Sequence, residues 1–317
     1  MRRLGARRVP GFASAILIRV SGLNSIIRQA IADTWGIPRP KVVPHHLGMN
    51  SGTWMVSHGE HRWIAKSVPA ARHRRFVGGL ECAAIVDDAG IPAGRPEPTS
   101  DGRPWASVEG QTLALLRFVA GDPLTGTAGG EQELIGSTLA RAHRALRDAR
   151  VADAETFHWL DADASHLDVE PWARSAVRDA IIGYDALPPN SLAWGLLHSD
   201  PAPEAFLFDR RGDRCGLIDW DFGLRGPLMY DVASAVMYVG GPSRASALLD
   251  GYLGEGVMHA TEVERSLATM LRLRWAVQAD YFSRRIAADD LTGIAGPAEN
   301  RRGLDDARRA LMASRED

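Results

Sequence analysis

The stretch that decides the fold runs over residues 196–235 and reads LLHSDPAPEAFLFDRRGDRCGLIDWDFGLRGPLMYDVASA. It holds two acidic centres about twenty residues apart, a His-Ser-Asp motif at 198–200 and an Asp-Trp-Asp motif at 219–221, each after an apolar run. Residues 205–209 between them predict a strand, and residues 210–213 predict a hairpin turn. The hairpin should bring both centres to the same end of one small sheet, where carboxylates suit a metal site or a base beside a metal.

The order of the motifs is more informative than any single aspartate, which after a strand is often only a turn former or a helix cap. HxD, IDWD and GPxxYDxA follow one another at a spacing typical of phosphotransferases. On these motifs, residues 40–285 resemble the aminoglycoside phosphotransferase and choline kinase-like family, whose core is a protein-kinase-like catalytic lobe. The resemblance implies an α+β, two-lobed protein-kinase-like fold, with a small N-terminal β-sheet lobe and a mostly helical C-terminal lobe.

Three segments are expected along the chain. Residues 1–22 carry four arginines and then a short apolar run that Arg19 interrupts, which loosely resembles a signal peptide without a clear cleavage site. We expect them to form a disordered leader. The N-terminal nucleotide-binding lobe should span 23–119, and the C-terminal catalytic and substrate-binding lobe should span 120–317.

Composition narrows the possible partners and compartments. The chain has 317 residues, 45% of them hydrophobic, and a net charge of −2, so no global basic field indicates nucleic acid. Cys82 and Cys215 are the two cysteines, both in apolar contexts, which favours a reducing cytoplasm without disulfides. No apolar run approaches the roughly 20 residues of a membrane helix. We expect a cytoplasmic monomer or homodimer.

The first lobe carries the predicted nucleotide site. Residues 41–68 predict three strands, and the loop with Gly48, Ser51 and Gly52 could close over phosphates because glycine lets the backbone approach a ligand. The alternative is that these residues serve only as a turn. Lys66 ends the third strand, where the resemblance implies contact with the α- and β-phosphates of ATP or GTP. The alternative is an exposed strand lysine.

Two further nucleotide contacts are implied by the resemblance. Residues 71–90 predict a helix. In kinase-like folds a glutamate of this helix, here Glu81, pairs with the strand lysine, although a solvated glutamate fits equally well. Two adjacent glycines in the same helix indicate either close packing or mobility. The backbone around Leu116 and Phe118 should form the hinge that binds the adenine edge.

The C-terminal motifs supply the predicted chemistry. Phosphoryl transfer needs in-line positioning, metal neutralisation of phosphate charge and a group that orients or deprotonates the acceptor. Asp200 is the expected catalytic carboxylate, and His198 should brace its loop. Asp219 is the expected principal Mg²⁺ ligand, with support from Asp221. Asp231 should hold the catalytic loop in place by accepting hydrogen bonds.

One position departs from the family pattern. The asparagine expected five residues after the catalytic aspartate, a metal ligand, is Ala205 here. Either the neighbouring Glu204 supplies the ligand, or only one metal is held tightly, or the protein binds nucleotide without efficient transfer.

The acceptor is left open by the sequence. A small-molecule hydroxyl is expected, foremost that of an antibiotic, which would make the protein a resistance enzyme. The alternatives are a metabolic kinase for choline, homoserine or a sugar, and a non-catalytic nucleotide-binding protein. The acidic residues Asp161, Asp163 and Asp168 could meet a cationic acceptor, or they form a solvated loop.

Replacing Ala205 by asparagine separates these alternatives. If the alanine impairs an otherwise intact site, Ala205→Asn restores a metal ligand and raises the rate of transfer several-fold. If Glu204 and Ala205 belong to a working variant, the substitution lowers that rate. Steady-state transfer rates at saturating nucleotide and Mg²⁺ distinguish the two results.

Overall fold

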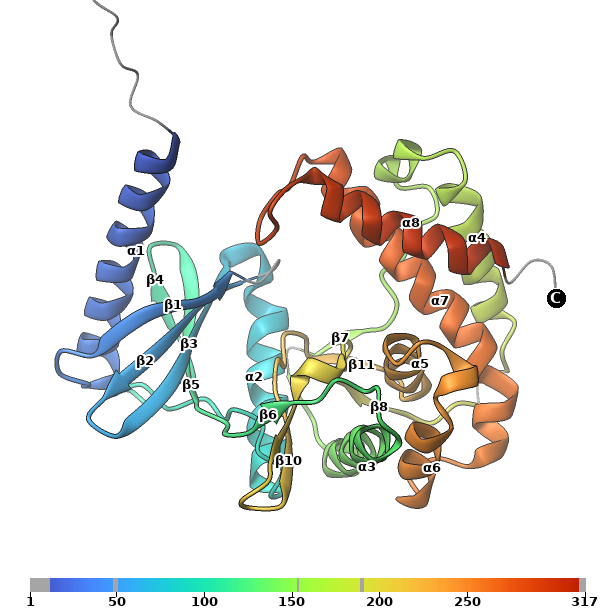
Figure 1. Cartoon of the computed structure of the whole chain (residues 1–317), viewed down its shortest axis with the longest axis horizontal. Helices are drawn as coiled ribbons and strands as arrows, with labels where there is room; N and C mark the ends of the chain where they lie inside the picture. Colours follow the sequence, from blue (N-terminus) through green and yellow to red (C-terminus); the bar gives the residue numbers. More distant parts are fainter. Residues whose placement is uncertain (1–11, 48–50, 153, 189–190, 314–317) are drawn as a thin grey trace, which may run out of the picture.

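The computed structural model describes residues 12–47, 51–152, 154–188 and 191–313, which form two lobes (Figure 1). The first lobe is a five-stranded antiparallel sheet with a helix against each face. The second lobe is mostly helical and holds two three-stranded sheets. The predicted α+β, two-lobed architecture is therefore confirmed.

The sheet of the first lobe places Lys66 on its central strand. Its strands are β1 (Lys41–Leu47), β2 (Gly52–His58), β3 (His61–Pro69), β4 (Ala106–Val108) and β5 (Gln111–Arg117). Their order is β1-β2-β3-β5-β4, so β3 lies in the middle. Lys66 is opposite Thr53 on β2 and Ala114 on β5. Side chains opposite each other share a face, so Lys66 points to the same side as Ala114.

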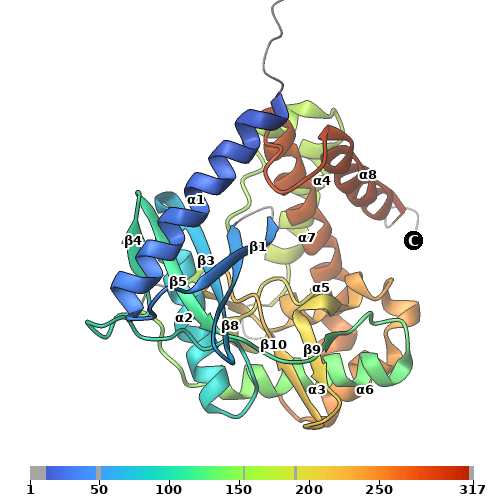
Figure 2. The same cartoon turned by 60° about the vertical axis from the view of Figure 1, so that its left-hand side comes forward.

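Helix α1 (Phe12–Trp35) lies across the other face of the sheet, as Figure 2 shows. Ile27 and Ile31 are buried there against Trp54 and other apolar strand residues. The helix begins at Phe12, so the second half of the expected leader is helical. Residues 12–20 contain neither proline nor glycine, so their sequence is compatible with a continuous helix.

Helix α2 (His73–Asp88) follows the short 3₁₀ helix η1 (Ala70–Arg72) and is shared by the two lobes. Phe76 and Leu80 pack against the sheet, in one cluster with Val68 and Ala114. Other buried side chains of α2, namely Cys82, Ala83 and Val86, belong to the core of the large lobe.

The paired glycines of α2 permit a backbone-to-backbone contact with the loop after β10. A Cβ at Gly78 would lie 3.0 Å from the Cα of Gly223, and a Cβ at Gly79 would overlap the carbonyl oxygen of Trp220. The Gly223 amide also donates a 3.1 Å hydrogen bond to the carbonyl of Arg75. Close packing, rather than mobility, is therefore the reason for these glycines.

Six helices form most of the large lobe. They are α3 (Gly129–Leu146), α4 (Ala173–Asp185), α5 (Met229–Tyr238), α6 (Ser246–Gly254), α7 (Ala260–Ala287) and α8 (Pro297–Ala313). Helix α7 packs against α4, α5 and α8, while α3 packs against α6. Helix α4 was not predicted from the sequence. Its buried face is largely alanine (Ala173, Ala176 and Ala180), which gives only a weak periodic signal.

Short strands and 3₁₀ turns complete the lobe. The strands are β6 (Asp122–Pro123), β7 (Glu155–Thr156), β8 (Trp194–Leu197), β9 (Phe206–Asp209), β10 (Arg214–Leu217) and β11 (Leu224–Pro227). The turns are η2 (Ser165–Val169), η3 (Pro203–Ala205) and η4 (Pro242–Arg244).

The predicted hairpin is confirmed as β9 and β10, but the two acidic centres do not share one sheet. The sheets have the orders β10-β9-β6 and β7-β11-β8, so the strand before Asp200 and the strand before Asp219 are in different sheets. The reason is that β8 pairs with β11 instead of the hairpin. Leu217 is nevertheless opposite Phe206, which keeps the two centres at the same end of the hairpin.

Both cysteines are buried free thiols, as the sequence predicts. Burial raises the pKa of Cys82 to about 12, and it also raises the pKa of Cys215. In the part of the chain that the structure describes, no helix combines the length and the apolar character needed to cross a membrane.

The close approach at α2 predicts opposite effects of two Gly→Ala substitutions. Gly79→Ala forces α2 away from the Asp219 loop, and such overpacking costs about 1–3 kcal/mol. Gly130→Ala in α3 is the control, because a Cβ there meets no atom within 4 Å. Removing a helical glycine should raise stability by up to about 1 kcal/mol. Urea unfolding of both variants measures the difference, and equal stabilities would contradict the packing described for α2.

Candidate active site

A buried carboxylate holds the backbone of the His-Ser-Asp motif. Asp231 lies in the first turn of α5 and is 0% exposed. Its Oδ2 accepts a 2.7 Å hydrogen bond from the amide of His198, and its Oδ1 accepts a 2.8 Å bond from the amide of Ser199. Ser199 has a φ of +74°, a conformation that side chains rarely adopt. The role predicted for Asp231 is confirmed, and its bonds stabilise this strained turn.

A second buried histidine completes the environment of Asp231. The Nε2 of His143 lies 3.0 Å from Asp231 Oδ2, and its Nδ1 lies 2.8 Å from the hydroxyl of Tyr252. Because an ionised carboxylate only accepts, Nε2 carries a proton here. Its Nδ1 faces the Tyr252 hydroxyl on the opposite side of the ring. His143 therefore connects α3, and through Tyr252 also α6, to Asp231 on α5 and to the loop that Asp231 holds.

His198 joins the two acidic centres. Its Nε2 donates a 2.7 Å hydrogen bond to the carbonyl of Ile218, directly before Asp219. The ring is 1% exposed and packs edge-on against Trp220, with centroids 4.7 Å apart. The bracing contact predicted for His198 is therefore present, although a direct part in catalysis stays a prediction.

The Asp-Trp-Asp motif is held in an equally specific turn. Asp219 has a φ of +67°. The amide of Ile218 donates to the carbonyl of Ala205 at 2.9 Å, and the indole Nε1 of Trp220 donates to the carbonyl of Leu217 at 2.8 Å. These bonds leave the Asp219 side chain 62% exposed, whereas Asp221 is 22% exposed.

Lys66 connects the two lobes through these carboxylates. Its Nζ lies 3.2 Å from Asp219 Oδ1 and also forms an ion pair with Asp221 Oδ1. Burial alone would lower the pKa of Lys66, but the attraction of Asp221 and Asp219 outweighs burial and raises it. Lys66 in turn is the largest cause of the lowered pKa of Asp219. Lys66 is therefore held as a cation between the carboxylates of Asp219 and Asp221.

The other predicted nucleotide contacts are less fully defined. Glu81 lies on α2 and is half-buried, and its pairing with Lys66 stays a prediction. Gly48 lies outside the described residues. Ser51 directly precedes β2, and Gly52 begins it, opposite the neighbour of Lys66, Ser67.

The predicted hinge lies at the end of β5, where part of the backbone is already bonded. The amide of Arg117 donates to the carbonyl of Arg95 at 2.9 Å. Leu116 forms a bridge with Pro96, and the ring of Phe118 stacks under the guanidinium of Arg62 at 4.0 Å. A contact of Leu116 or Phe118 with adenine stays a prediction.

Two residues beside Asp200 were not found by the sequence analysis. Its Oδ1 accepts hydrogen bonds from the hydroxyl of Tyr238 at 2.5 Å and from Nη2 of Arg274 at 3.0 Å. Arg274 is 7% exposed, and Met270, Leu271 and Leu273 are buried near it on the same helix. The available signal was an arginine next to these apolar residues, although no motif linked it to a residue 74 positions away.

Ala205 and Glu204 lie in η3, just before β9. Ala205 is 3% exposed and uses its carbonyl in the bond to Ile218, whereas Glu204 is exposed. Within the described ranges, no three Asp, Glu, His or Cys side chains are grouped as a ready-made metal site. Asp219 and Asp221 are thus the carboxylates that converge, and a role of Glu204 as ligand stays a prediction.

The predicted acidic patch is largely neutralised. Asp163 pairs with Arg178 at 2.8 Å, and Asp168 pairs with Arg174 at 2.6 Å. Asp161 accepts a bond from the amide of Asp163 at 2.8 Å. These contacts favour the reading of a solvated loop over that of a cationic acceptor site.

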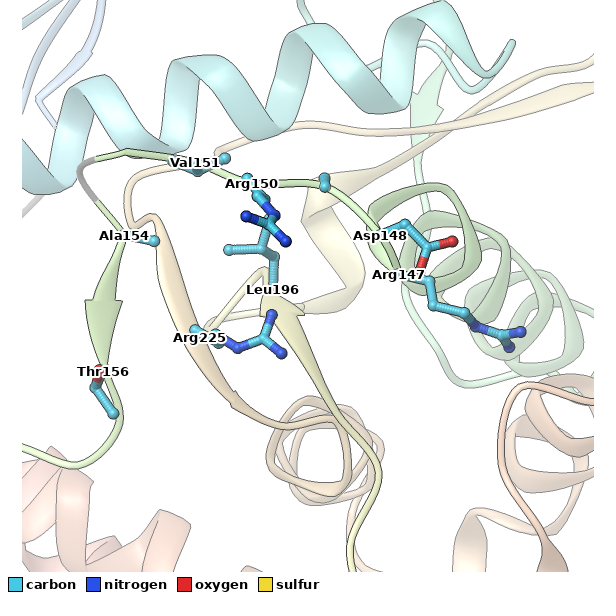
Figure 3. A pocket seen from close by; sticks show the side chains of 9 residues that line it. Arg147, Asp148, Arg150, Val151, Ala154, Thr156, Leu196 and Arg225 are labelled. Atoms are coloured by element: carbon cyan, nitrogen blue, oxygen red, sulfur yellow. The ribbon is translucent and has the colours of Figure 1, made fainter.

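A pocket of about 500 Å³ lies apart from the acidic centres, between the end of α3 and strands β7, β8 and β11 (Figure 3). The side chains of Arg150 and Arg225 point into it, and Leu196 forms part of its wall. None of the predicted site residues lines this pocket.

The two lobes, the lysine on the central strand of one and the carboxylates of the other that it contacts are typical of phosphotransferases with a kinase-like fold. The sequence profile of the phosphotransferase enzyme family matches residues 41–265, and the chain belongs to that family. The family predicted from the motifs is therefore confirmed.

The individual solved structures that resemble this chain have low sequence identity to it. The solved structure of an amicoumacin kinase in complex with AMP-PNP, Ca²⁺ and Ami has a TM-score of 0.72 at 14% identity and covers 94% of this chain and 96% of its own. A microcompartment-associated aminopropanol kinase has a TM-score of 0.68 at 17% identity, covering 90% and 95%. At these identities the likeness shows the fold.

A homoserine kinase of Rhodopseudomonas palustris (strain TIE-1) is 28% identical over 203 residues, covering 58% of this chain and 60% of the relative. The chain thus spans about 60% of the length of this curated relative.

Removing the Asp231 carboxylate should disrupt the site and the fold together. Asp231→Ala leaves two backbone amides and the His143 ring without their buried acceptor. Each such loss costs about 1–3 kcal/mol, so we expect a total of about 3 kcal/mol or more. Asp209→Ala is the matched control, because that carboxylate accepts one bond in an exposed hairpin turn. Urea unfolding of both proteins provides the comparison, and similar losses would argue against a supporting role of Asp231.

Proposed function

We propose that the protein transfers the γ-phosphoryl group of ATP, or of GTP, to a hydroxyl group of a small molecule in the cytoplasm. The observation that carries the proposal is the contact of Lys66 with Asp219 and Asp221, because it joins a strand lysine of one lobe to two carboxylates of the other. Membership in the phosphotransferase enzyme family supports the same reaction class.

Lys66 would bind the phosphates of the nucleotide. A buried ammonium group held by two carboxylates can exchange one of these partners for phosphate oxygens without a net loss of charge pairing. The phosphates would be supported by Glu81, Gly48, Ser51 and Gly52. The backbone of Leu116 and Phe118 would bind the adenine ring of the nucleotide. These assignments rest on the family pattern and on their places in the first lobe.

The carboxylates fit a divalent metal that accompanies the nucleotide. Asp219 and Asp221 face a single lysine, so the group carries one excess negative charge. Mg²⁺ is typically held by one or two carboxylates together with substrate phosphates and water, and it would neutralise phosphate charge here. Asp219 would be the main ligand, with Asp221 and Glu204 as further candidates.

Asp200 would receive the acceptor hydroxyl. The acceptor oxygen forms a bond to the γ-phosphorus while the bond from that phosphorus to the bridging oxygen of the nucleoside diphosphate breaks. The hydroxyl proton passes to the Asp200 carboxylate, and the nucleoside diphosphate leaves with the bridging oxygen. His198 and Asp231 would act only by holding the loop.

A metabolic alcohol is the first acceptor class to test. The curated relatives that match by sequence are homoserine kinases, at 25–29% identity. The paired acidic residues near η2 offer little free negative charge to a cationic antibiotic. An antibiotic acceptor remains the second candidate, because an amicoumacin kinase has the highest TM-score of the two structures compared.

The test is Mg²⁺-dependent phosphorylation of a panel of acceptors, read by mass spectrometry. The panel contains homoserine, amino alcohols, choline, sugars and hydroxyl-bearing antibiotics. A product heavier by one phosphoryl group identifies the acceptor. In Asp200→Asn we expect the rate to fall by about 10²–10⁴-fold, the usual contribution of a general base. In Asp219→Asn we expect a higher Mg²⁺ requirement as well as a lower rate.

Asp209→Asn is the control for both aspartate variants, because its carboxylate lies in the β9–β10 turn, outside the proposed site. Its rate should stay within about twofold of the wild type. Unchanged transfer by Asp200→Asn would refute the assigned mechanism. If nucleotide fails to bind the wild type in calorimetry, the roles of Lys66 and Asp219 are wrong.

A further inference from the structure

Arg274 places a buried positive charge beside the proposed catalytic carboxylate. It comes from the middle of α7, and its Nη2 lies 3.0 Å from Asp200 Oδ1. Its Nε donates to the hydroxyl of Ser234 at 3.1 Å, which fixes the plane of the guanidinium. Asp200 is its ion-pair partner in the described part of the chain. Arginine is almost never fully buried unless it is paired, so the contact with Asp200 compensates the buried charge.

One face of α5 builds the remaining contacts. Tyr230, Ser234 and Tyr238 follow one another at intervals of four residues, so they share a side of the helix. Ser234 donates to the carbonyl of Tyr230 at 2.9 Å and accepts from Arg274. Tyr238, one turn further, lies 3.1 Å from Arg274 Nη2. The helix that anchors the catalytic loop through Asp231 thus also reaches the Asp200 side chain.

The direction of each hydrogen bond follows from the chemistry of the donors. Arg274 has no acceptor, so Nη2 donates to the oxygen of Tyr238 as well as to Asp200. The Tyr238 hydroxyl then directs its own proton at Asp200 Oδ1, 2.5 Å away. Desolvation raises the pKa of Tyr238, and the Asp200 charge acts in the same direction against the opposing effect of Arg274. The phenol therefore stays protonated, as a donor, at neutral pH.

Both donors bind the same carboxylate oxygen. Oδ1 receives Tyr238 and Arg274, while no hydrogen bond to Oδ2 is described, and the Asp200 side chain is 56% exposed. Two donors from two helices fix both the position of Oδ1 and the rotation of the carboxylate plane. Oδ2 is thereby the oxygen left to meet a substrate.

Resting on the proposed function, we propose that Tyr238 and Arg274 are positioning residues that hold Asp200 by Oδ1 and present Oδ2 to the acceptor hydroxyl. They touch neither the hydroxyl nor the phosphate and act only through Asp200. Loss of either donor lets the carboxylate rotate, and small misplacements of a reacting group reduce transfer steeply. The nucleotide site, built around Lys66, is not affected.

The test is a double-mutant cycle between Tyr238→Phe and Asp200→Asn. The Tyr238→Phe substitution removes one hydroxyl and keeps the ring. Rates are measured with γ-³²P-labelled ATP and the acceptor found by the panel, so that residual turnover is quantified. In the wild-type background, Tyr238→Phe should lower kcat on the order of 10- to 100-fold, with the KM for ATP unchanged. In the Asp200→Asn background it should change the rate by less than about twofold, since its target is already altered.

Two further variants sharpen the cycle. Arg274→Lys keeps the charge but lacks the planar fork that reaches both Ser234 and Asp200, so its kcat should lie between those of the wild type and Arg274→Met. Tyr184→Phe on α4 is the matched control and should keep both kcat and KM. An equal fold-loss from Tyr238→Phe in both backgrounds, or a raised KM for ATP with kcat intact, would overturn the positioning role.

A double-mutant cycle on stability tests the contact between Arg274 and Asp200 independently of the proposed function. Asp200→Ala should lower Tm in the wild type, because it leaves Arg274 buried without an acid, and it should lower Tm less in the Arg274→Met background. If Asp200→Ala lowers Tm equally in both backgrounds, Arg274 and Asp200 do not interact in solution. If the wild type transfers phosphate to no acceptor, the proposed function fails and the positioning role with it, whatever the stability cycle shows.

Discussion

The buried carboxylate of Asp231 is the constraint on which the rest of the site depends. A charge with no exposed surface is tolerated only when it is fully hydrogen-bonded, and here two amides and an imidazole provide that compensation. The same bonds hold Ser199 in its left-handed conformation. Helix α5 favours a negative charge at its N-terminal turn, which adds to the effect. Stability of the core and geometry of the cleft therefore arise from one interaction.

Charge is distributed unevenly on either side of this loop. Toward the first lobe, one lysine lies between two aspartates, which leaves a negative excess. Toward α7, one aspartate faces one buried arginine, which leaves the pair balanced. The proposed metal site thus lies on the side with the negative excess, and the proposed acceptor site lies on the side where the ion pair is balanced.

Local motifs predicted the fold well, and long-range contacts limited what could be predicted of the site. The strands around Lys66, the hairpin and the role of Asp231 follow from short patterns of residues. Helix α4 escaped notice because alanine gives little periodic contrast. Arg274 contacts Asp200 only because α7 packs on α5, a tertiary event that no spacing encodes. The start of α1 was missed because arginine-rich composition favoured a leader over a helix.

The glycine contact between α2 and the Asp219 loop has a mechanical consequence. At Gly78 and Gly223 backbone meets backbone, so no side chain there can swing aside. A shift of the Asp219 loop is therefore expected to move α2 as a rigid body. The sheet meets α2 through side chains such as Phe76 and Leu80, a type of contact that permits small shear. We infer that α2 is attached more rigidly to the large lobe than to the sheet of the first lobe.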